Sequence, residues 1–418
     1  MATYRHGAFV DEQATSLVPP VEVESALPFV VGTAPVHNLK DGTPPVNEPL
    51  LVTSFADFVE RFGAPAEGED AHDYTLYEFA RVYIGRYGMA PVVFVNVFDP
   101  AKHVSEDAES PGPDVGKVAD ADIVGGVDAS TGKRTGLELV HEVFPRFRLV
   151  PCQILAPGFS ALPEVAVSIG AACTGVSGLF RATGIIDVPA SVRTPTDAPA
   201  WLNTNNLTDS GLMAFFGQPV YGDAVEWGST HLAGVIAARD SENDGIPFWS
   251  PSNKRLLCNG LSHAGEVLNL TPEEAAYLNG NGIVTALNMI GGLVAWGDQT
   301  CAYPGVTDVK DSSIPIRRMF NWIGNTLILT AWQFVSSPLR RRMIETVQDT
   351  FNVWLNGLAA REFILGGRVT FEADENPTTN LMDGKVRFHV YVTPPSAARE
   401  IVFTLEYDPD YLETLFAA

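Results

Sequence analysis

The sequence predicts a mixed α/β fold with more than one domain. Helical and strand-like hydrophobic patterns alternate from about residue 50 to residue 290, two long helical patterns follow, and the chain then shows period-2 segments. A chain of 418 residues is long enough for two or three hydrophobic cores. Because strands that alternate with helices are typical of βαβ units, we expect a partly parallel sheet in the first part.

The first 25 residues predict an extended arm. Gly7, Ala8, Phe9 and Val10 can form one short strand, and Pro19-Pro20 stops regular pairing after it. No helical periodicity appears before residue 50. A strand of ~4 to 6 residues that its own chain does not bury can be added to a sheet edge of another chain.

Clear helix and strand signals begin at residue 53. Ser54 is a predicted N-cap, Asp57 occupies the third helical position, and Gly63 is the predicted stop. A second helix is expected over 75–87 and a buried strand over 91–98, followed by a loop at 99–122 that is rich in Asp, Glu, Pro and Gly.

The later elements follow the same rules. Thr271-Pro272-Glu273-Glu274 is a capping box with proline at the first helical position, and Ser337-Pro338 is expected to cap the second long helix. The predicted helices are 135–144, 162–174, 271–278, 315–335 and 338–359, and the predicted strands are 150–155, 183–188, 282–290, 386–392 and 401–407. The last two are period-2 segments and are expected to be half-buried.

Composition and charge narrow the functional classes. The chain is 46% hydrophobic and 18% charged, with a mean hydropathy of +0.08 that suits either a large core or surface buried on assembly. A net charge of −23 argues against binding to nucleic acid. No apolar run reaches the ~18 to 20 residues of a membrane helix, and the N-terminal residues lack a signal-peptide core, so we expect cytoplasmic synthesis. The four cysteines form no CxxC pair, and free buried thiols are expected.

The search for catalytic or binding motifs yields none. Gly126–Arg134 has five residues between its glycines and Arg after Lys133, so it does not fit a phosphate-binding P-loop. Gly158–Leu162 lacks the second glycine of a nucleophile elbow, and Ser160 is expected to cap the next helix instead. The eight histidines show no metal-ligand spacing. We therefore expect no catalytic residue, no cofactor and no metal, although carboxylates brought together only in space escape such a search.

Two arginine clusters stand out in this acidic chain. Arg317-Arg318 and Arg340-Arg341-Arg342 lie near the starts of the two long predicted helices. One interpretation is a solvated face, and the other is an electropositive patch that docks an acidic partner. Positive charge near a helix start opposes the helix dipole, which favours a role other than helix stability.

Short segments spread over nearly the whole chain match the segments of one known protein family, and they occur in the same order along the sequence. They are His6–Val10, Phe29–Pro35, Asn47–Ser54, Phe58–Gly63, Ile123–Gly126, Gly132–Leu137, Leu155–Gly158, Ile186–Pro189, Leu232–Asp240, Trp249–Asn253, Leu278–Ile283, Val294–Thr300 and Ile316–Phe320. Together they resemble contractile phage tail sheath proteins, and the compact length is similar to that of the sheaths of P2-like phages and R-type pyocins. Gln299 stands where family members often carry Arg.

The resemblance implies a structural subunit and not an enzyme. Subunits of this family form stacked six-membered rings around a tail tube and contract to drive the tube through a target cell envelope. The implied organisation is an arm at 1–25, an α/β sheath core with an outer region at 26–300, an inner, tube-facing domain at 301–398, and a strand arm at 399–418. The implied partners are further copies of the chain, the tail tube protein, and baseplate and tail terminator proteins, with no direct contact to nucleic acid and no membrane insertion.

Particular residues receive roles from this resemblance. The residues expected to donate strands to neighbouring subunits are Gly7, Ala8, Phe9, Val10, Ile401, Val402, Phe403, Thr404 and Leu405. Arg340, Arg341 and Arg342 are the expected contacts to an acidic tube. The implied location is the tail of a virion or of a phage tail-like particle, assembled in the cytoplasm of the host bacterium. An α/β enzyme of hydrolase or nucleotide-binding type, and another virion or secretion component, remain the alternatives.

Overall fold

The computed structural model describes residues 20–40, 43–105 and 112–415. Its centre is a nine-stranded sheet in the order β13-β17-β16-β10-β9-β8-β1-β3-β2. The strands are β1 (Pro28–Gly32), β2 (Leu50–Val52), β3 (Val92–Asn96), β8 (Gln153–Leu155), β9 (Thr183–Asp187), β10 (Leu212–Phe216), β13 (Lys254–Arg255), β16 (Ile283–Met289) and β17 (Gly292–Trp296). The six central strands are parallel, and β2, β17 and β13 add antiparallel edges, which confirms the mixed α/β class and the partly parallel sheet.

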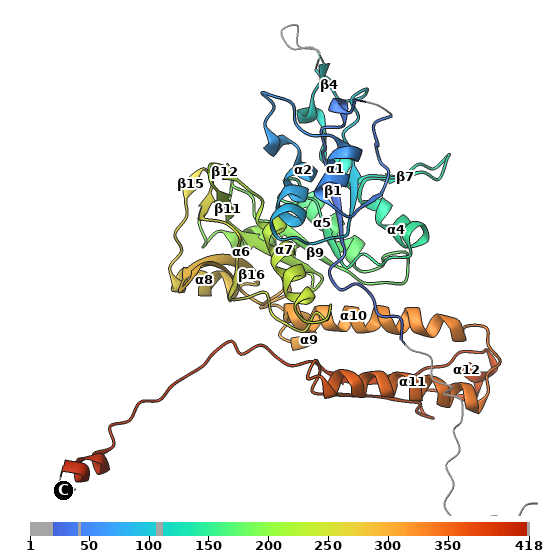
Figure 1. The fold of residues 1–418 in the computed structure, drawn as a ribbon. Helices are drawn as coiled ribbons and strands as arrows, with labels where there is room; N and C mark the ends of the chain where they lie inside the picture. Colours follow the sequence, from blue (N-terminus) through green and yellow to red (C-terminus); the bar gives the residue numbers. More distant parts are fainter. Residues whose placement is uncertain (1–19, 41–42, 106–111, 416–418) are drawn as a thin grey trace, which may run out of the picture.

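Helices cover both faces of this sheet (Figure 1). Successive residues of β1 point to opposite faces, so Val30 belongs to one hydrophobic cluster whereas Phe29 and Val31 belong to the other. The cluster around Val30 includes residues of α1 (Phe55–Phe62), α2 (Thr75–Phe79) and α7 (Gly228–Ser241). The cluster around Phe29 includes residues of α3 (Asp120–Val124), α4 (Val140–Phe147) and α5 (Pro163–Cys173). Burial on both faces explains why the central strands are continuously apolar.

Several local predictions are confirmed. The hydroxyl of Ser54 caps α1 by accepting from the backbone N–H of Asp57 at 3.1 Å, and Thr271 and Glu274 form the expected capping box of α8 (Pro272–Asn279). Gly63 ends α1 with a φ of 84°, and a side chain there would bring its Cβ to 2.6 Å from the carbonyl oxygen of Pro35. Only glycine fits this stop without displacing backbone.

Other predictions are corrected. The helix expected over 75–87 is α-helical only to Phe79 and continues as a π-helix, Ala80–Arg86. Ser337-Pro338 does not cap the second long helix, because α11 begins at Arg341 with Arg340 at the N-cap. The loop at 99–122 contains short elements of its own in its described part, among them the β4–β5 pair (Val104–Ser105 and Gly112–Pro113) and α3.

Two long helices form a layer beside the α/β body (Figure 1). They are α10 (Ile314–Ala331) and α11 (Arg341–Ala360), preceded by α9 (Val309–Ser312) and followed by β18 (Gly366–Thr370), α12 (Thr378–Met382) and β19 (His389–Thr393). Met319, Trp322, Phe351 and Trp354 of these helices join the cluster around Phe29, so the helix pair and the sheet share one continuous apolar core.

The remaining described elements lie around the body. A second sheet has the order β12-β11-β14-β15. The elements not yet given are α6 (Ala198–Thr204), β6 (Gly126–Val127), β7 (Arg134–Thr135), β11 (Gln218–Tyr221), β12 (Ala224–Val225), β14 (Gly260–His263), β15 (Glu266–Val267), and the short helices Val36–Asn38, Ala71–Asp73, Val115–Lys117, Gly136–Leu139, Trp332–Phe334 and Pro409–Leu415. All four cysteines are free, as expected, with three of them buried. Within the described ranges, each helix is too short or too polar to span a bilayer.

Candidate interaction surfaces

The described part of the N-terminal segment, residues 20–25, is held by the long helices. The backbone N–H of Val21 donates to the Thr330 hydroxyl at 2.9 Å, and the indole of Trp322 donates to the carbonyl of Val23 at 2.8 Å. Glu22 accepts a hydrogen bond from the indole of Trp354 at 2.8 Å. These hydrogen bonds fix the path of the chain where it enters the α/β body. Gly7, Ala8, Phe9 and Val10 lie outside the described residues, and their role as a donated strand stays a prediction.

Arg317 and Arg318 form neither a solvated face nor a docking patch. Both are buried: Arg317 pairs with Asp311 at 2.8 Å, and the guanidinium of Arg318 grips both carboxylate oxygens of Asp240. The hydroxyl of Ser25 donates to the same carboxylate at 2.7 Å. This network joins the incoming N-terminal segment, α7 and α10. Sequence reasoning missed it because the partners lie far apart along the chain.

Arg340, Arg341 and Arg342 do lie on the surface. All three are exposed where α11 begins, and Arg341 pairs with Glu345 of the same helix at 2.7 Å. An exposed pair of this kind contributes little to stability, so most of the positive charge remains available to a partner. Their contact with a tube stays a prediction.

The segment after β19 has no regular secondary structure from Pro394 to Asp408. The period-2 segment 401–407 was expected to be a half-buried strand, and this expectation is wrong for the isolated chain. Ile401 is 71% exposed and Leu405 is 95% exposed, and Val402, Phe403 and Thr404 between them are exposed as well. Within the described part of the chain, no backbone hydrogen bond joins 401–407 to the body. Large apolar side chains exposed along both faces of an extended segment are a surface suited to burial by another molecule.

A two-stranded sheet in the same region offers one free edge. β18 pairs with β19 in antiparallel register from Gly366–Thr393 to Thr370–His389, and the described residues add no third strand. α11 packs against β18 and covers one side of the pair. The amide side chain of Asn352 in α11 binds both backbone groups of Val369, at 2.8 and 3.1 Å, so the outer edge of β18 is occupied at this residue. Among the described residues, no hydrogen bond is recorded at the outer edge of β19, which can therefore accept a strand.

The carboxyl edge of the parallel strands is the place where doubly wound folds bind ligands. Here it carries Ser160 and Ser229 around Asp187, and all three are buried. Both hydroxyls donate to the Asp187 carboxylate, at 3.1 and 2.5 Å, and the backbone N–H of Ser229 donates at 2.7 Å. Burial raises the pKa of Asp187 to about 6. The three groups satisfy one another beneath the surface, so Ser160 is a core hydrogen-bonding residue and not the helix cap that we expected.

A second buried network surrounds Glu226. Its carboxylate accepts from Arg86 at 2.6 and 2.8 Å, from Arg81 at 3.1 Å and from His231 at 2.9 Å. Burial opposes the charge of Glu226, but the hydrogen bonds from His231 and Arg86 outweigh it and lower its pKa to about 2. Burial also lowers the pKa of His231, so the neutral ring donates to Glu226 and accepts from the hydroxyl of Tyr87 at 3.0 Å. This closed network ties the π-helix to α7.

The described residues thus combine satisfied buried polar clusters with exposed, unpaired segments. They include no group of three or more His, Cys, Asp or Glu side chains arranged to hold a metal ion. The exposed apolar segment 401–407 places the chain in the class of proteins that associate through their surface.

Comparison with known proteins shows which proteins of this class the chain resembles. No family model matches the chain. Two curated proteins match: the tail sheath protein of Burkholderia phage BcepMu, 24% identical over 489 aligned positions covering 99% of each chain, and a putative prophage major tail sheath protein of Pseudomonas aeruginosa, 26% identical over 374 positions covering 88% of this chain and 87% of that one.

Solved structures agree with these relatives. The chain superposes on a sheath complex of the extracellular contractile injection system PVC in the contracted state, with a TM-score of 0.67, 16% identity, and coverage of 98% and 99%. It also matches the contracted helical sheath of the anti-feeding prophage, with a TM-score of 0.66, 16% identity, and coverage of 97% and 100%. The described part of the chain has the fold of contractile sheath proteins, and its resemblance to tail sheath proteins is confirmed.

Proposed function

We propose that the protein is the structural subunit of a contractile tail sheath. In this role, copies assemble as stacked hexameric rings around a tail tube, and the lattice contracts to drive the tube through the envelope of a target cell. The proposed location is the tail of a virion or of a phage tail-like particle. The relatives named tail sheath proteins and the contracted sheath structures support this role, and the α/β enzyme alternative has no support from them.

One observation of the molecule carries the proposal. Residues 401–407 expose Ile401, Phe403 and Leu405 together with a backbone that forms no hydrogen bond to the described body. Each backbone hydrogen bond gained on pairing is worth roughly 1 kcal/mol net, and burial of the apolar side chains adds to it. A donated strand therefore stabilises an assembly in which the monomer alone cannot bury this segment.

The receiving site in this proposal is the free edge of the β18–β19 pair on a second copy. A two-stranded sheet is marginal by itself, and a third strand stabilises it.

The proposed organisation has two arms. The segment 1–25, with Gly7 to Val10, is the N-terminal arm, and 399–418 is the C-terminal arm. Between them lie the core, 26–300, and the inner domain, 301–398. Stacked rings held by such arms stay connected while the subunits move relative to one another.

The proposal is tested by electron microscopy of the purified protein. Negative staining at increasing concentration should show hollow striated cylinders. A variant with Phe403→Asp and Leu405→Asp should remain as separate subunits, because strand donation would bury two charges. Separate small particles of the wild-type protein at all concentrations would contradict the proposed function.

The proposed partners besides further copies are the tail tube protein, the baseplate and the tail terminator. A neighbour of this fold in the 6-fold symmetrised baseplate of the anti-feeding prophage supports hexameric rings that meet a baseplate. Arg340, Arg341 and Arg342 are the proposed contacts to an acidic tube, because they are exposed at one end of the helix layer.

Charge reversal tests this contact. Replacement of all three arginines by Glu should abolish sheath assembly on tubes, because attraction becomes repulsion. The matched control reverses Lys40, Lys117 and Lys133, which are exposed on the α/β body and change the net charge equally. Docking of the arginine variant at low salt as strong as that of the control would overturn the assignment.

A further inference from the structure

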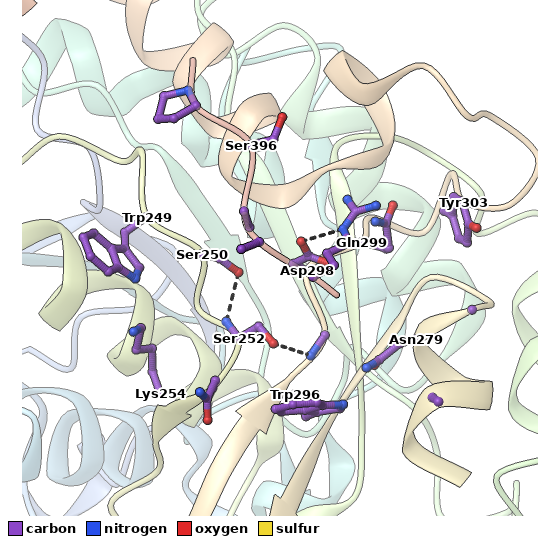
Figure 2. Close-up of a pocket in the computed structure, with 18 of the residues that line it drawn as sticks. Trp249, Ser250, Ser252, Lys254, Asn279, Trp296, Asp298, Gln299, Tyr303 and Ser396 are labelled. Atoms are coloured by element: carbon purple, nitrogen blue, oxygen red, sulfur yellow. Dashed lines mark hydrogen bonds and ion pairs between the residues drawn. The ribbon is translucent and has the colours of Figure 1, made fainter. Parts of the chain in front are cut away.

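The chain returns to the α/β body after the last strand. β19 ends at Thr393, and residues 395–399 then line a cleft of about 700 Å³ against the body. The facing wall includes Trp249 and Trp296 (Figure 2). The chain thus touches the body once more before the exposed segment 401–407 begins.

The contact is made by the guanidinium of Arg399. Its Nε donates to the carboxylate of Asp298 at 2.9 Å, the ion pair marked at Asp298 in Figure 2. The amide oxygen of Gln299, oriented by its hydrogen bonds, accepts from both terminal nitrogens of the same guanidinium, while its amide nitrogen donates to the carbonyl of Ser312 at 2.8 Å. A planar guanidinium is suited to two neighbouring acceptors at once.

The two acceptors are fixed by the backbone. Asp298 and Gln299 are only 7% and 5% exposed, and they lie directly after β17 in the chain. The carbonyl of Asp298 accepts from the N–H of Ile314 at 2.9 Å, and the N–H of Thr300 donates to Ser312 at 2.8 Å. Among the described residues, the ion pair recorded for the Asp298 carboxylate is with Arg399. A largely buried carboxylate needs such a cation.

We propose that Arg399, Asp298 and Gln299 form a clasp that positions the C-terminal arm for donation to a second copy of the chain. This inference rests on the proposed sheath function and adds a positioning site to it. Arg399 holds the root of the arm on the body, and the exposed apolar residues begin two positions later, at Ile401. Gln299 serves this purpose as a neutral acceptor, whereas an arginine at that position would repel Arg399.

The geometry gives the size of the expected change in the local concentration of the arm. With the clasp closed, about two residues separate the fixed point from Ile401; with it open, about eight residues separate Thr393 from Ile401. For a flexible chain the end-to-end distance grows as the square root of length, so opening doubles it from about 8 to about 16 Å. The volume explored rises about eight-fold, and the local concentration of the arm at a neighbouring sheet edge falls by the same factor.

The experiment compares Arg399→Gln with the wild type and with Arg146→Gln. Arg146 is a matched control because it is similarly exposed (44% against 49%), and within the described ranges its ion pairs are with Glu142 at 2.7 Å and with Glu48 at 3.9 Å, neither of which belongs to the C-terminal arm. Two readouts are used. One is the mobility of a spin label on Ser396→Cys in the unassembled subunit, in a Cys258→Ser background. The other is the critical concentration for cylinder formation, measured by sedimentation.

Arg399→Gln should mobilise the label and raise the critical concentration about eight-fold, while Arg146→Gln leaves both unchanged. Arg399→Lys keeps the charge and should fall between the two, and Asp298→Asn should mobilise the label as Arg399→Gln does. An immobile label and an unchanged critical concentration in Arg399→Gln would refute the clasp. If the wild-type protein forms no cylinders, the sheath function fails, and the spin label still decides whether the clasp exists.

Discussion

The buried pair between Arg318 and Asp240 gives the sharpest stability prediction. Arg318→Met removes a guanidinium whose side chain is 3% exposed and leaves the equally buried Asp240 carboxylate with the Ser25 hydroxyl as its remaining recorded partner. Removal of one partner from a buried ion pair costs about 3 to 5 kcal/mol, because the other charge stays buried without compensation. The variant should therefore unfold at a clearly lower denaturant concentration.

Urea unfolding of the unassembled subunit measures this cost. Tryptophan fluorescence reports on the shared core, since the rings of Trp322 and Trp354 lie 5.5 Å apart there. With an m-value of about 4 kcal/mol per molar urea for a chain of this size, 4 kcal/mol moves the midpoint by about 1 M. Arg341→Met is the control: its side chain is 92% exposed, and loss of its helical pair should cost at most about 0.5 kcal/mol.

The double variant Arg318→Met/Asp240→Asn separates the loss of the ion pair from the cost of the unpaired Asp240 charge. Because it lacks the unpaired carboxylate, the double variant should recover a large part of the lost free energy of unfolding. A neutral amide costs less to bury than a carboxylate. The reasoning fails if Arg318→Met shifts the midpoint no further than Arg341→Met does. It also fails if the double variant is no more stable than the single one.

Two more predictions concern the core. The folded-state pKa of Asp187, about 6, lies above its ordinary value of 3.8, so its contribution to stability is fully present below about pH 4 and is lost as the pH rises through about 6. Asp187→Asn should match the wild type near pH 4 and exceed its free energy of unfolding by roughly 3 kcal/mol at pH 7, in urea titrations at both values. Gly234→Ala in α7 should cost about 1 to 3 kcal/mol despite better helix propensity, because the new Cβ would lie 2.5 Å from the ring of Tyr87, whose hydroxyl is fixed by His231. The matched change Gly324→Ala in α10 meets no atom within 4 Å and should stabilise by about 0.5 to 1 kcal/mol in the same thermal or urea assay; equal effects of the two changes would contradict the packing argument.

Local rules in the sequence predicted the elements that depend on local contacts. The Ser54 cap, the glycine stop at Gly63 and the capping box at Thr271 involve residues within four or so positions of one another, so spacing alone identifies them. The alternation of strands and helices likewise predicted the partly parallel sheet. The caps and stops were predicted correctly because short-range geometry determines them, whereas the parallel sheet followed from the fold that alternating strands and helices favour.

The long-range polar contacts could not be predicted in this way. Arg318 pairs with a carboxylate 78 positions away, and Arg399 with one 101 positions away. A charge pattern read along the chain shows that Arg317-Arg318 is a cluster, but it cannot show that Asp240 of α7 pairs with Arg318 inside the fold. Ser160 was misassigned for the same reason, since its partner, Asp187, belongs to the next strand of the sheet.

The segment 401–407 shows a different limit of prediction from sequence. Its alternating pattern is that of a strand with one buried face, yet the described chain offers it no partner and leaves both faces exposed. A sequence pattern encodes the contacts of the functional assembly, whereas a single chain displays only the contacts that it makes with itself. The disagreement between the two is therefore informative: a strand pattern without a strand in the described chain supports the proposed donation of this segment to the sheet of a second copy.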